Sequence, residues 1–211
     1  MTLKLQNYIE QRPTWPQAGK HVLAQYDETS VVVYQAYRPA IADHAVAHQA
    51  FGGPFSFERM TWIKPNFLWM MYRSGWALKE HQTRVLALHV RRPVFDHWLE
   101  TAVASSAKAS HLQADDWKRA VKSSSARFQW DPDHAPSGQG VTRRAIQVGL
   151  RGREIDGFRG DAFVRIEDVT PLVHEQREHR VTLDELRTPA ERVYPLSAAA
   201  RANLRADVFT E

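Results

Sequence analysis

Two eight-residue apolar runs constrain the fold more than any other feature of the chain. "SVVVYQAY" at residues 30–37 and "TRVLALHV" at residues 83–90 are rich in β-branched and apolar side chains. Each run is far shorter than a membrane-spanning helix, and neither alternates cleanly between apolar and polar residues. We therefore predict two strands that are buried on both faces. A chain with such strands must cover their sheet with other elements.

Helical signals follow each of these strands. Pro39 begins a predicted helix that the glycine pair at 52–53 would end. Asn66 is the predicted cap of a helix of about two turns, with Gly75 as its stop. From Pro93 to Val103, apolar residues recur at i, i+3, i+4, i+7 and i+8, which is typical of an amphipathic helix.

The second half of the chain continues with shorter elements. A helix is predicted at residues 115–122, because its acidic start and basic end suit the helix dipole. The remaining predicted elements are strands at 126–130, 143–150 and 161–169, a turn-rich loop at 131–140, a helix from Pro171, and, from 188, a surface loop and a helix capped by Ser197. This irregular alternation predicts an α+β domain with a central mixed or antiparallel sheet and flanking helices.

The length and composition suit one globular domain. With 211 residues, 43% of them hydrophobic, the chain is long enough to bury one sizeable core. We predict an extended N-terminal arm at 1–20 whose Trp15 docks on the body, a globular domain at 21–196, and a C-terminal helix or tail at 197–211.

Composition also excludes several classes of chemistry. The chain has no cysteine, so disulfides, thiolate nucleophiles and cysteine-based metal sites are excluded. Its start lacks the apolar segment of a signal peptide, and no run of eighteen apolar residues occurs, which predicts a cytoplasmic protein without membrane contact. The net charge of +4, dominated by arginine, favours phosphate-bearing partners such as nucleotides or nucleic acid.

Familiar catalytic signatures are missing from the sequence. There is no glycine-rich dinucleotide fingerprint, no triphosphate loop and no serine-hydrolase elbow. His44 and His48 stand at metal-sharing spacing, but no third ligand is fixed, and a polar helix face is the favoured interpretation. Asp131, Asp133 and His134 lack the glutamate that closes a calcium loop; a turn that uses these carboxylates is favoured over a magnesium-dependent hydrolase site.

Arginines, aromatics and buried amides form the remaining pattern. Amide side chains on apolar strands need a partner, which is either structural or a base or ribose. Aromatic rings stack bases, and arginines hold phosphates. The predicted ligand-binding residues are Tyr37, Arg38, Lys64, Tyr72, Arg73, Ser74, Trp76, Arg127, Gln129, Arg144 and Gln147, with Gln35 beside them on the first strand.

The stretch "MTWIKPNFLWMMYRSGW", at residues 60–76, divides into two predicted parts. Its apolar members Trp62, Phe67, Leu68 and Met71 are predicted to lie in the core. Its end, residues 73–76, is predicted to form the rim of a pocket shared with Gln35 and Tyr37.

Several long segments resemble a known family. "VVVYQAYRPAIADHAV", "FSFERMTWIKPNFLWMMYRSGW", "RFQWDPDH", "RRAIQVGLRG", "IEDVTPLVHEQR" and "TPAERVYPL" are similar to segments of the domain of unknown function 4291 family. The similarity extends from about Asp27 to Pro195, and it implies a stand-alone protein without an assigned activity.

A second resemblance rests only on the order of the elements. It is to ADP-ribosyltransferase-like domains, and it implies NAD as the cofactor. The corresponding residues would be Arg38 for the NAD, Tyr72 or Trp76 for the nicotinamide, and Glu167 for the ribose. Gln35 stands on the first strand, where such domains have a basic residue.

These observations lead to two hypotheses of different kinds. The first is a nucleotide-handling enzyme, with ADP-ribosyl transfer from NAD as its most concrete form and with Glu167 and Gln35 as catalytic residues. The alternative is a non-catalytic module that binds RNA or single-stranded nucleic acid through the same basic and aromatic surface. Buried amides favour a pocket over a flat nucleic-acid surface.

Overall fold

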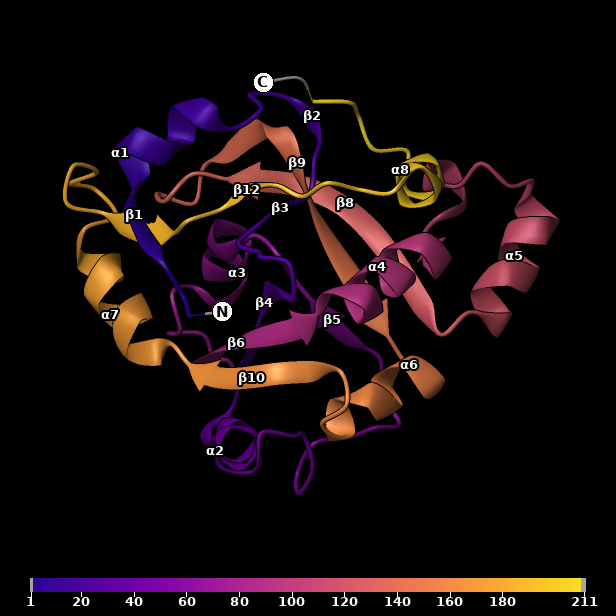
Figure 1. Ribbon diagram of the computed structural model, residues 1–211, viewed down its shortest axis with the longest axis horizontal. Coiled ribbons are helices and arrows are strands. Elements are labelled where there is room, and N and C mark those ends of the chain that lie inside the picture. Colours follow the sequence, from indigo (N-terminus) through magenta and orange to yellow (C-terminus); the bar gives the residue numbers. More distant parts are fainter. Residues whose placement is uncertain (1, 210–211) are drawn as a thin grey trace.

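The two predicted central strands pair with each other. The computed structural model, which describes residues 2–209, places β4 (Ser30–Tyr37) antiparallel to β6 (Arg84–Arg91). β10 (Phe163–Asp168) pairs with the other edge of β6, so β6 is the middle strand (Figure 1). The predicted burial of both strands is confirmed, because nearly all their residues between the ends are inaccessible to solvent.

A second, mixed sheet is built around β9 (Gly140–Leu150). One edge of β9 pairs with β8 (Ala126–His134), and its other edge pairs with β2 (Gly19–Lys20) at one end and β5 (Thr61–Ile63) at the other. β7 (Val103–Ala104) lies outside β8. The pairs β2–β9 and β7–β8 are parallel, and the other pairs of this sheet are antiparallel.

One isolated bridge joins the two sheets into a curled surface. The backbone N–H of Tyr34 donates to the Lys64 carbonyl at 2.7 Å, and the N–H of Lys64 donates to the Tyr34 carbonyl at 3.1 Å. Because Lys64 directly follows β5, this bridge places the end of β5 beside the middle of β4. The joined sheets and their flanking helices confirm the predicted α+β class (Figure 1).

Short strand pairs and helices complete the fold. β1 (Leu5–Asn7) pairs with β11 (Arg187–Pro189), and β3 (Leu23–Ala24) pairs with β12 (Arg192–Val193), so both ends of the chain are tied together. The helices are α1 (Tyr8–Gln11), α2 (Pro39–His48), α3 (Phe67–Ser74), α4 (Arg92–Thr101), α5 (Ala114–Ser123), α6 (Arg153–Asp156), α7 (Thr170–Glu178) and α8 (Ala198–Leu204), with single 3₁₀ turns at Arg12–Thr14, Ala107–Ala109 and Gly157–Arg159.

Alternate residues of the central strands enter two different cores. Val31 and Val33 of β4 pack in the larger core, together with Trp98 of α4. Val32 and Tyr34, on the opposite face of the same strand, pack in a smaller core under α3. This alternation explains why both strands are apolar along their whole length, since each of their faces is covered.

The predicted caps are largely confirmed. Asn66 accepts the backbone N–H of Trp69 at 2.7 Å, and Gly75 ends α3 in the left-handed conformation with φ 59°. Ser197 accepts the N–H of Ala200 and caps α8. α2 ends earlier than predicted, since Gln49, with φ 53°, is its cap in place of the glycine pair.

Three further predictions of boundary or exposure are wrong. α4 ends at Thr101, and Val103 lies in β7 because the chain turns there to pair with β8. Residues 131–134 continue β8 and pair with β9. The segment after Thr188 is not a surface loop, because Glu191 and Tyr194 are buried. Burial of these side chains depends on contacts with distant parts of the chain, which local sequence does not reveal.

The N-terminal arm is folded. Residues 5–14 contain β1, α1 and a 3₁₀ turn in place of an extended segment. Trp15 is buried and donates from its indole N–H to the Glu191 carbonyl at 2.9 Å, so its predicted docking is confirmed. Among the described residues, no helix has the length and apolar character needed to cross a membrane.

Candidate functional site

A pocket of about 660 Å³ opens where β4 and β5 separate. The Tyr34–Lys64 bridge is an isolated pair, and the strands diverge from it towards Tyr37 and Thr61. This volume lies within the usual range of small-molecule sites. We call it the β4–β5 pocket; its lining is Gln35, Ala36, Tyr37, Arg38, Ile41, Pro54, Phe55, Ser56, Arg59, Met60, Thr61, Trp62, Lys64, Met70, Arg73, His81 and Gln82.

One wall of the pocket is a loop at residues 54–60. Its Phe55 is buried, and the ring packs against Phe51 and stacks near Phe158. The loop can reach this position because Gly52 passes under His44, where an added Cβ would lie 2.7 Å from the imidazole Nε2. The rings of His44 and His48 stack at a centroid distance of 4.1 Å, which agrees with a polar helix face.

The charges that line the pocket have one sign. Arg38 stands at the start of α2, Arg59 on the wall loop, and Arg73 in the last turn of α3. Lys64 adds a fourth basic group, and no aspartate or glutamate belongs to the described lining. Such a pocket attracts anions, because its positive charges are not neutralised from within.

Lys64 is the least accessible of these basic groups. Lys64 is only 5% exposed, and its side-chain nitrogen donates to the Trp62 carbonyl at 3.2 Å. Burial and, to a smaller extent, the charge of Arg73 lower its pKa to about 7, against the opposing charge of Asp131. A large fraction of Lys64 is therefore a neutral amine near neutral pH.

Three hydrogen-bonded side chains bridge the two diverging strands. The Gln35 amide donates to the Thr61 hydroxyl at 2.6 Å, and the Tyr37 hydroxyl donates to the Gln35 carbonyl oxygen at 2.8 Å. The hydroxyls of Tyr37 and Thr61 are 3.1 Å apart. Burial raises the pKa of Tyr37, so its phenol is neutral. This group fixes the orientation of the Gln35 amide at the pocket surface.

The structure brings five predicted site residues together and separates others from them. Gln35, Tyr37, Arg38, Lys64 and Arg73 all line the β4–β5 pocket. Their proximity follows from the bridge, which sequence spacing does not reveal.

Ser74 and Trp76, which were also predicted to belong to the rim, lie in the interior. The Ser74 hydroxyl donates to the Met70 carbonyl at 2.9 Å, and Trp76 is buried against Phe67. Trp62, predicted to lie in the core, is instead partly exposed and lines the pocket. The predicted burial of Phe67, Leu68 and Met71 is confirmed.

Tyr72 lies outside the pocket, on the surface of α3. The residue is 49% exposed, and its ring stacks on the His134 ring at a centroid distance of 3.5 Å. The Trp69 ring lies parallel to the same imidazole at 5.2 Å. One face of the Tyr72 ring is therefore already occupied by the protein itself.

The predicted strand amides have a structural partner. Gln129 of β8 and Gln147 of β9 face each other, and both donate to Asp131, at 2.6 and 2.8 Å. Arg127 donates to the Val121 carbonyl at the end of α5. Arg144 is exposed on β9 and does not line the pocket.

Glu167 lies on the opposite face of the sheet from Gln35. Side chains of residues that pair across antiparallel strands project from the same face of the sheet. Glu167 pairs with Ala87, and Ala87 pairs with Tyr34, so these three side chains share one face. Gln35 follows Tyr34 and therefore projects from the other face. One Glu167 oxygen lies 2.6 Å from the His89 Nε2, and the other contacts Arg165 at 3.1 Å. The structure does not bring the two predicted catalytic residues together.

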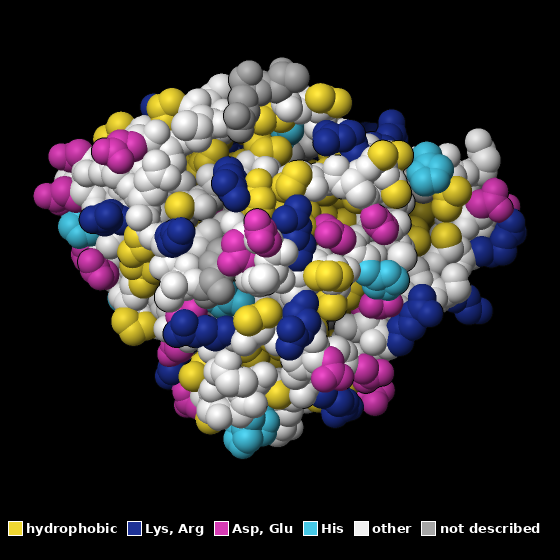
Figure 2. Space-filling view, in the orientation of Figure 1, with side chains coloured by type: hydrophobic (Ala, Val, Ile, Leu, Met, Phe, Trp, Pro, Cys, Tyr) yellow, Lys and Arg dark blue, Asp and Glu magenta, His cyan; other side chains and the backbone are white. Residues whose placement is uncertain are grey.

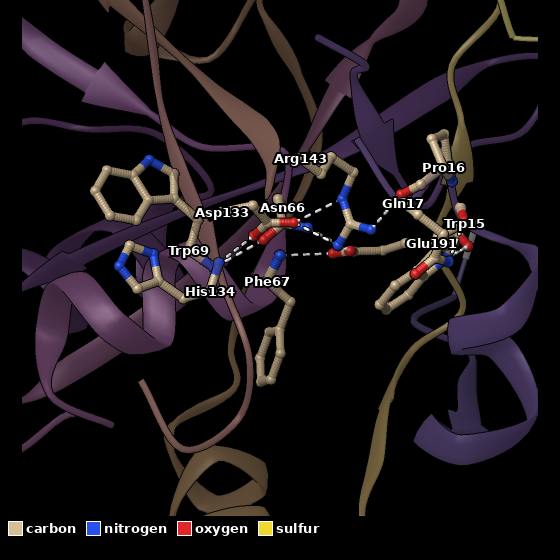
Figure 3. Close-up of polar contacts among 10 residues, drawn as sticks. All are labelled: Trp15, Pro16, Gln17, Asn66, Phe67, Trp69, Asp133, His134, Arg143 and Glu191. Atoms are coloured by element: carbon tan, nitrogen blue, oxygen red, sulfur yellow. Dashed lines mark hydrogen bonds and ion pairs between the residues drawn. The ribbon is translucent and has the colours of Figure 1, made fainter. Parts of the chain in front are cut away.

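A group of buried charges lies outside the pocket, at the start of α3 (Figure 3). The Arg143 guanidinium donates to Asp133 at 2.8 and 2.5 Å and to the Pro16 carbonyl at 2.7 Å. Glu191 accepts the backbone N–H of Phe67 at 2.6 Å. We call Asp133, Arg143 and Glu191 the Arg143 cluster.

The Arg143 cluster holds distant segments together. Glu191 also accepts a hydrogen bond from the Asn66 amide at 3.1 Å. This glutamate side chain, from the C-terminal part of the chain, therefore fixes the turn between Lys64 and α3. Burial raises the pKa of Glu191, while the Phe67 N–H and the Arg143 charge act against that rise. Asp133 is engaged by Arg143, and within residues 2–209 no group of three or more His, Asp or Glu side chains is placed to hold a metal ion.

Several pocket residues carry no recognisable sequence signal. Arg59, His81 and Gln82 lie in loops, and Met70 lies within an apolar helix face that a core equally explains. Arg59 was not predicted, although it is a basic residue within the aromatic-rich segment "FSFERMTW".

Fold and site together define an α+β protein with a cationic pocket at the split of a curled sheet. The chain belongs to the family described as "Domain of unknown function (DUF4291)", whose model matches residues 21–194. The search of curated proteins found no match.

Proposed function

We propose that the protein is a nucleotide-handling enzyme whose ligand binds in the β4–β5 pocket. The observation that carries this proposal is the set of four basic side chains around a concave site whose described lining contains no carboxylate. Arginines bind phosphate oxygens through paired N–H donors, and a bound phosphate would balance the positive charge of this pocket.

The uncharged part of the lining suits a base and a sugar. The rings of Phe55, Tyr37 and Trp62 offer apolar and aromatic surface, and the amides of Gln35 and Gln82 offer donors and acceptors. Ligand sites commonly combine a mainly apolar lining with a few oriented polar groups. NAD, with a diphosphate and two planar bases, has the chemical groups that this lining would bind.

The proposal does not include ADP-ribosyl transfer. That reaction needs a carboxylate beside the ribose, and Glu167 projects from the opposite face of the sheet from Gln35. The pocket does contain a candidate nucleophile, the side-chain amine of Lys64.

A nucleic-acid module is supported less well. On the face shown in Figure 2, basic and acidic side chains interleave and do not form a continuous basic field. Single-stranded nucleic acid binds along a basic groove with exposed stacking rings. Tyr72 is the most exposed of the predicted stacking rings, and it already stacks on His134.

The test is a thermal-shift and calorimetric comparison of NAD, AMP, ATP and a short single-stranded RNA. A ligand of the folded state raises its melting temperature. We expect nucleoside phosphates to stabilise the wild type, and we expect Arg38→Gln and Arg73→Gln each to weaken binding about tenfold, the effect of losing one charge-assisted contact.

Matched variants separate the pocket from the rest of the surface. Arg144→Gln removes an exposed arginine outside the pocket, and Glu167→Gln alters the carboxylate on the other sheet face; both should bind nucleotides as the wild type does. Binding of RNA alone, with a steep dependence on salt and equal losses in the Arg38, Arg73 and Arg144 variants, would contradict the proposal.

A further inference from the structure

We propose that Lys64 is the reactive amine of the β4–β5 pocket and condenses with the carbonyl group of anionic aldehydes or ketones. The inference rests on the proposed function, because it uses the same anion-binding pocket, and it adds a substrate class and a covalent step. Three observations support the inference: the fixed backbone of Lys64, the absence of an acidic partner for its amine within the described residues, and the arginines that line the same pocket.

The backbone of Lys64 is held on both sides. Its N–H and carbonyl both bond to Tyr34, which is 0% exposed. Pro65 follows, and Asn66 then caps α3 and is itself bound by Glu191. The Lys64 side chain therefore starts from a fixed point, which is what a reactive group needs if it is to meet a bound carbonyl in one geometry.

The amine has no acidic partner. Its recorded hydrogen bond is to the Trp62 carbonyl, and it takes part in no ion pair in the described part of the chain. Asp131 acts on it at longer range, but both oxygens of that carboxylate accept amide groups of Gln129 and Gln147. Because an ammonium group is poorly accommodated here, a much larger fraction of Lys64 than of a solvated lysine is the neutral amine with its free electron pair.

The neighbouring arginines would hold the rest of the ligand. Arg73 affects the charge of Lys64 directly, and Arg38 and Arg59 line the same space. A phosphate or carboxylate bound to these guanidinium groups would place an attached carbonyl within the pocket that Lys64 lines. A pre-bound anion converts the encounter of amine and carbonyl into a reaction within one complex.

The condensation is balanced without an oxidant or reductant. The electron pair of Lys64 Nζ forms a bond to the carbonyl carbon, and the carbonyl oxygen takes up a proton to give a carbinolamine. That oxygen then leaves as water with the two hydrogens that the amine loses, and a carbon–nitrogen double bond remains. The products are an imine and one water molecule, and hydrolysis reverses the step.

Lys64 differs from the other six lysines of the chain in its surroundings. Solvated lysines are ammonium ions at neutral pH and are poor nucleophiles. The other lysines are exposed or partly exposed: Lys4, Lys20, Lys79, Lys108, Lys118 and Lys122. This difference makes site-selective reaction a direct test.

The probe is pyridoxal 5′-phosphate, which carries an aldehyde, a phosphate and a planar ring. The full-length protein is treated at pH 7, the imine is reduced with borohydride, and the adduct is located by peptide mass mapping. We expect at least about tenfold more adduct at Lys64 than at any other lysine, because the pocket arginines would hold the phosphate of the probe beside Lys64, and because its pKa of about 7 leaves a large neutral fraction of the amine at pH 7. ATP in excess should protect Lys64.

Two variants and an uncharged probe serve as controls. Lys79→Arg removes an exposed lysine near the end of α3 and should leave the Lys64 adduct unchanged. Lys64→Arg should abolish the dominant adduct. Pyridoxal lacks the phosphate, and its ratio of Lys64 adduct to surface-lysine adduct should be at least about tenfold lower, as expected when a phosphate contact is lost.

The outcomes separate this inference from the proposed function. Adducts spread over the surface lysines with Lys64 unmodified would overturn the inference, and the wild-type peptide map alone decides this even if Lys64→Arg fails to fold. Nucleotide binding without a Lys64 adduct overturns the inference and keeps the proposed function. A Lys64 adduct that ATP does not reduce, in a protein that binds no nucleotide, overturns the proposed function.

Discussion

The β4–β5 pocket and the Arg143 cluster both gather charged side chains, but the cluster is buried, whereas the three arginines of the pocket are exposed. In the Arg143 cluster, Arg143 pairs with Asp133 and lies near a second carboxylate, Glu191. In the pocket, Lys64 and three arginines are gathered with no carboxylate in the described lining. One cluster contains its own counter-charges, and the other does not.

This difference separates a structural role from a ligand-binding role. The Arg143 cluster connects the N-terminal arm, the start of α3 and the segment before β12, and its donors and acceptors are matched within the protein. The pocket holds positive charge that the folded chain leaves unbalanced. Like charges gathered around one concave site repel one another, so such a site is expected where an external partner of opposite charge supplies the balance.

The largest expected effect is loss of the Arg143 cluster. Asp133→Ala leaves a buried guanidinium without its carboxylate, and we expect the free energy of unfolding to fall by about 3–5 kcal/mol. Urea denaturation measures this change. The double variant Asp133→Leu with Arg143→Met removes both charges and should recover much of the loss; a loss below about 1 kcal/mol for Asp133→Ala would contradict a structural role.

The pocket is expected to respond in the opposite direction. Lys64→Met removes a buried cationic group without an acidic partner, and we expect it to raise the free energy of unfolding at pH 7 by a few kcal/mol, the order implied by the lowered pKa. Differential scanning calorimetry measures this gain. Lys79→Met, at an exposed position, is the matched control and should change stability by less than about 0.5 kcal/mol.

The pH dependence sharpens this second prediction. The pKa of Lys64 is about 7 in the folded state and near 10.4 in an unfolded chain. Between these values the unfolded chain binds more protons, so the wild type gains stability as the pH rises. The advantage of Lys64→Met should therefore be largest near pH 7 and shrink towards pH 10. An advantage that stays constant over this window would mean that Lys64 keeps its ordinary pKa.

A smaller effect is expected at the hydrogen-bonded group between the diverging strands. Tyr37→Phe removes the donor to Gln35 while keeping the ring, and we expect a loss of about 1 kcal/mol, as for one buried hydrogen bond. Thermal unfolding measures it. Because the Gln35 amide would then be held by Thr61 alone, nucleotide affinity should also fall; unchanged affinity would show that the orientation of Gln35 does not matter for binding.

Local sequence patterns predicted the central elements and failed where distant contacts decide. β4, β6 and α3 follow from apolar runs and from the caps at Asn66 and Gly75, which act within a few residues. β8 extends through residues 131–134 because β9 pairs with it and Arg143 neutralises Asp133. Glu191 is buried because Asn66 and Phe67, far away in the sequence, bond to it.

The candidate site could be predicted only in part for the same reason. Lys64, Arg73, Gln35 and Tyr37 were identifiable as residue types that bind ligands, but their convergence depends on the single bridge at Tyr34. The position of Glu167 relative to Gln35 depends on the strand register of β10, β6 and β4, and a shift of one residue would place it on the other face.

The central claim is that the positive charge of the pocket is balanced when an anionic ligand binds there. The ligand is the nucleoside phosphate that gives the largest thermal shift. Calorimetric titration with this ligand at pH 8, repeated in buffers of different ionisation enthalpy, measures how many protons the protein takes up on binding. A bound phosphate should raise the pKa of Lys64, so the account predicts that the wild type takes up part of one proton, with a fraction of Lys64 still neutral, and that Lys64→Met takes up none. Binding without proton uptake, or equal uptake by both proteins, would contradict it.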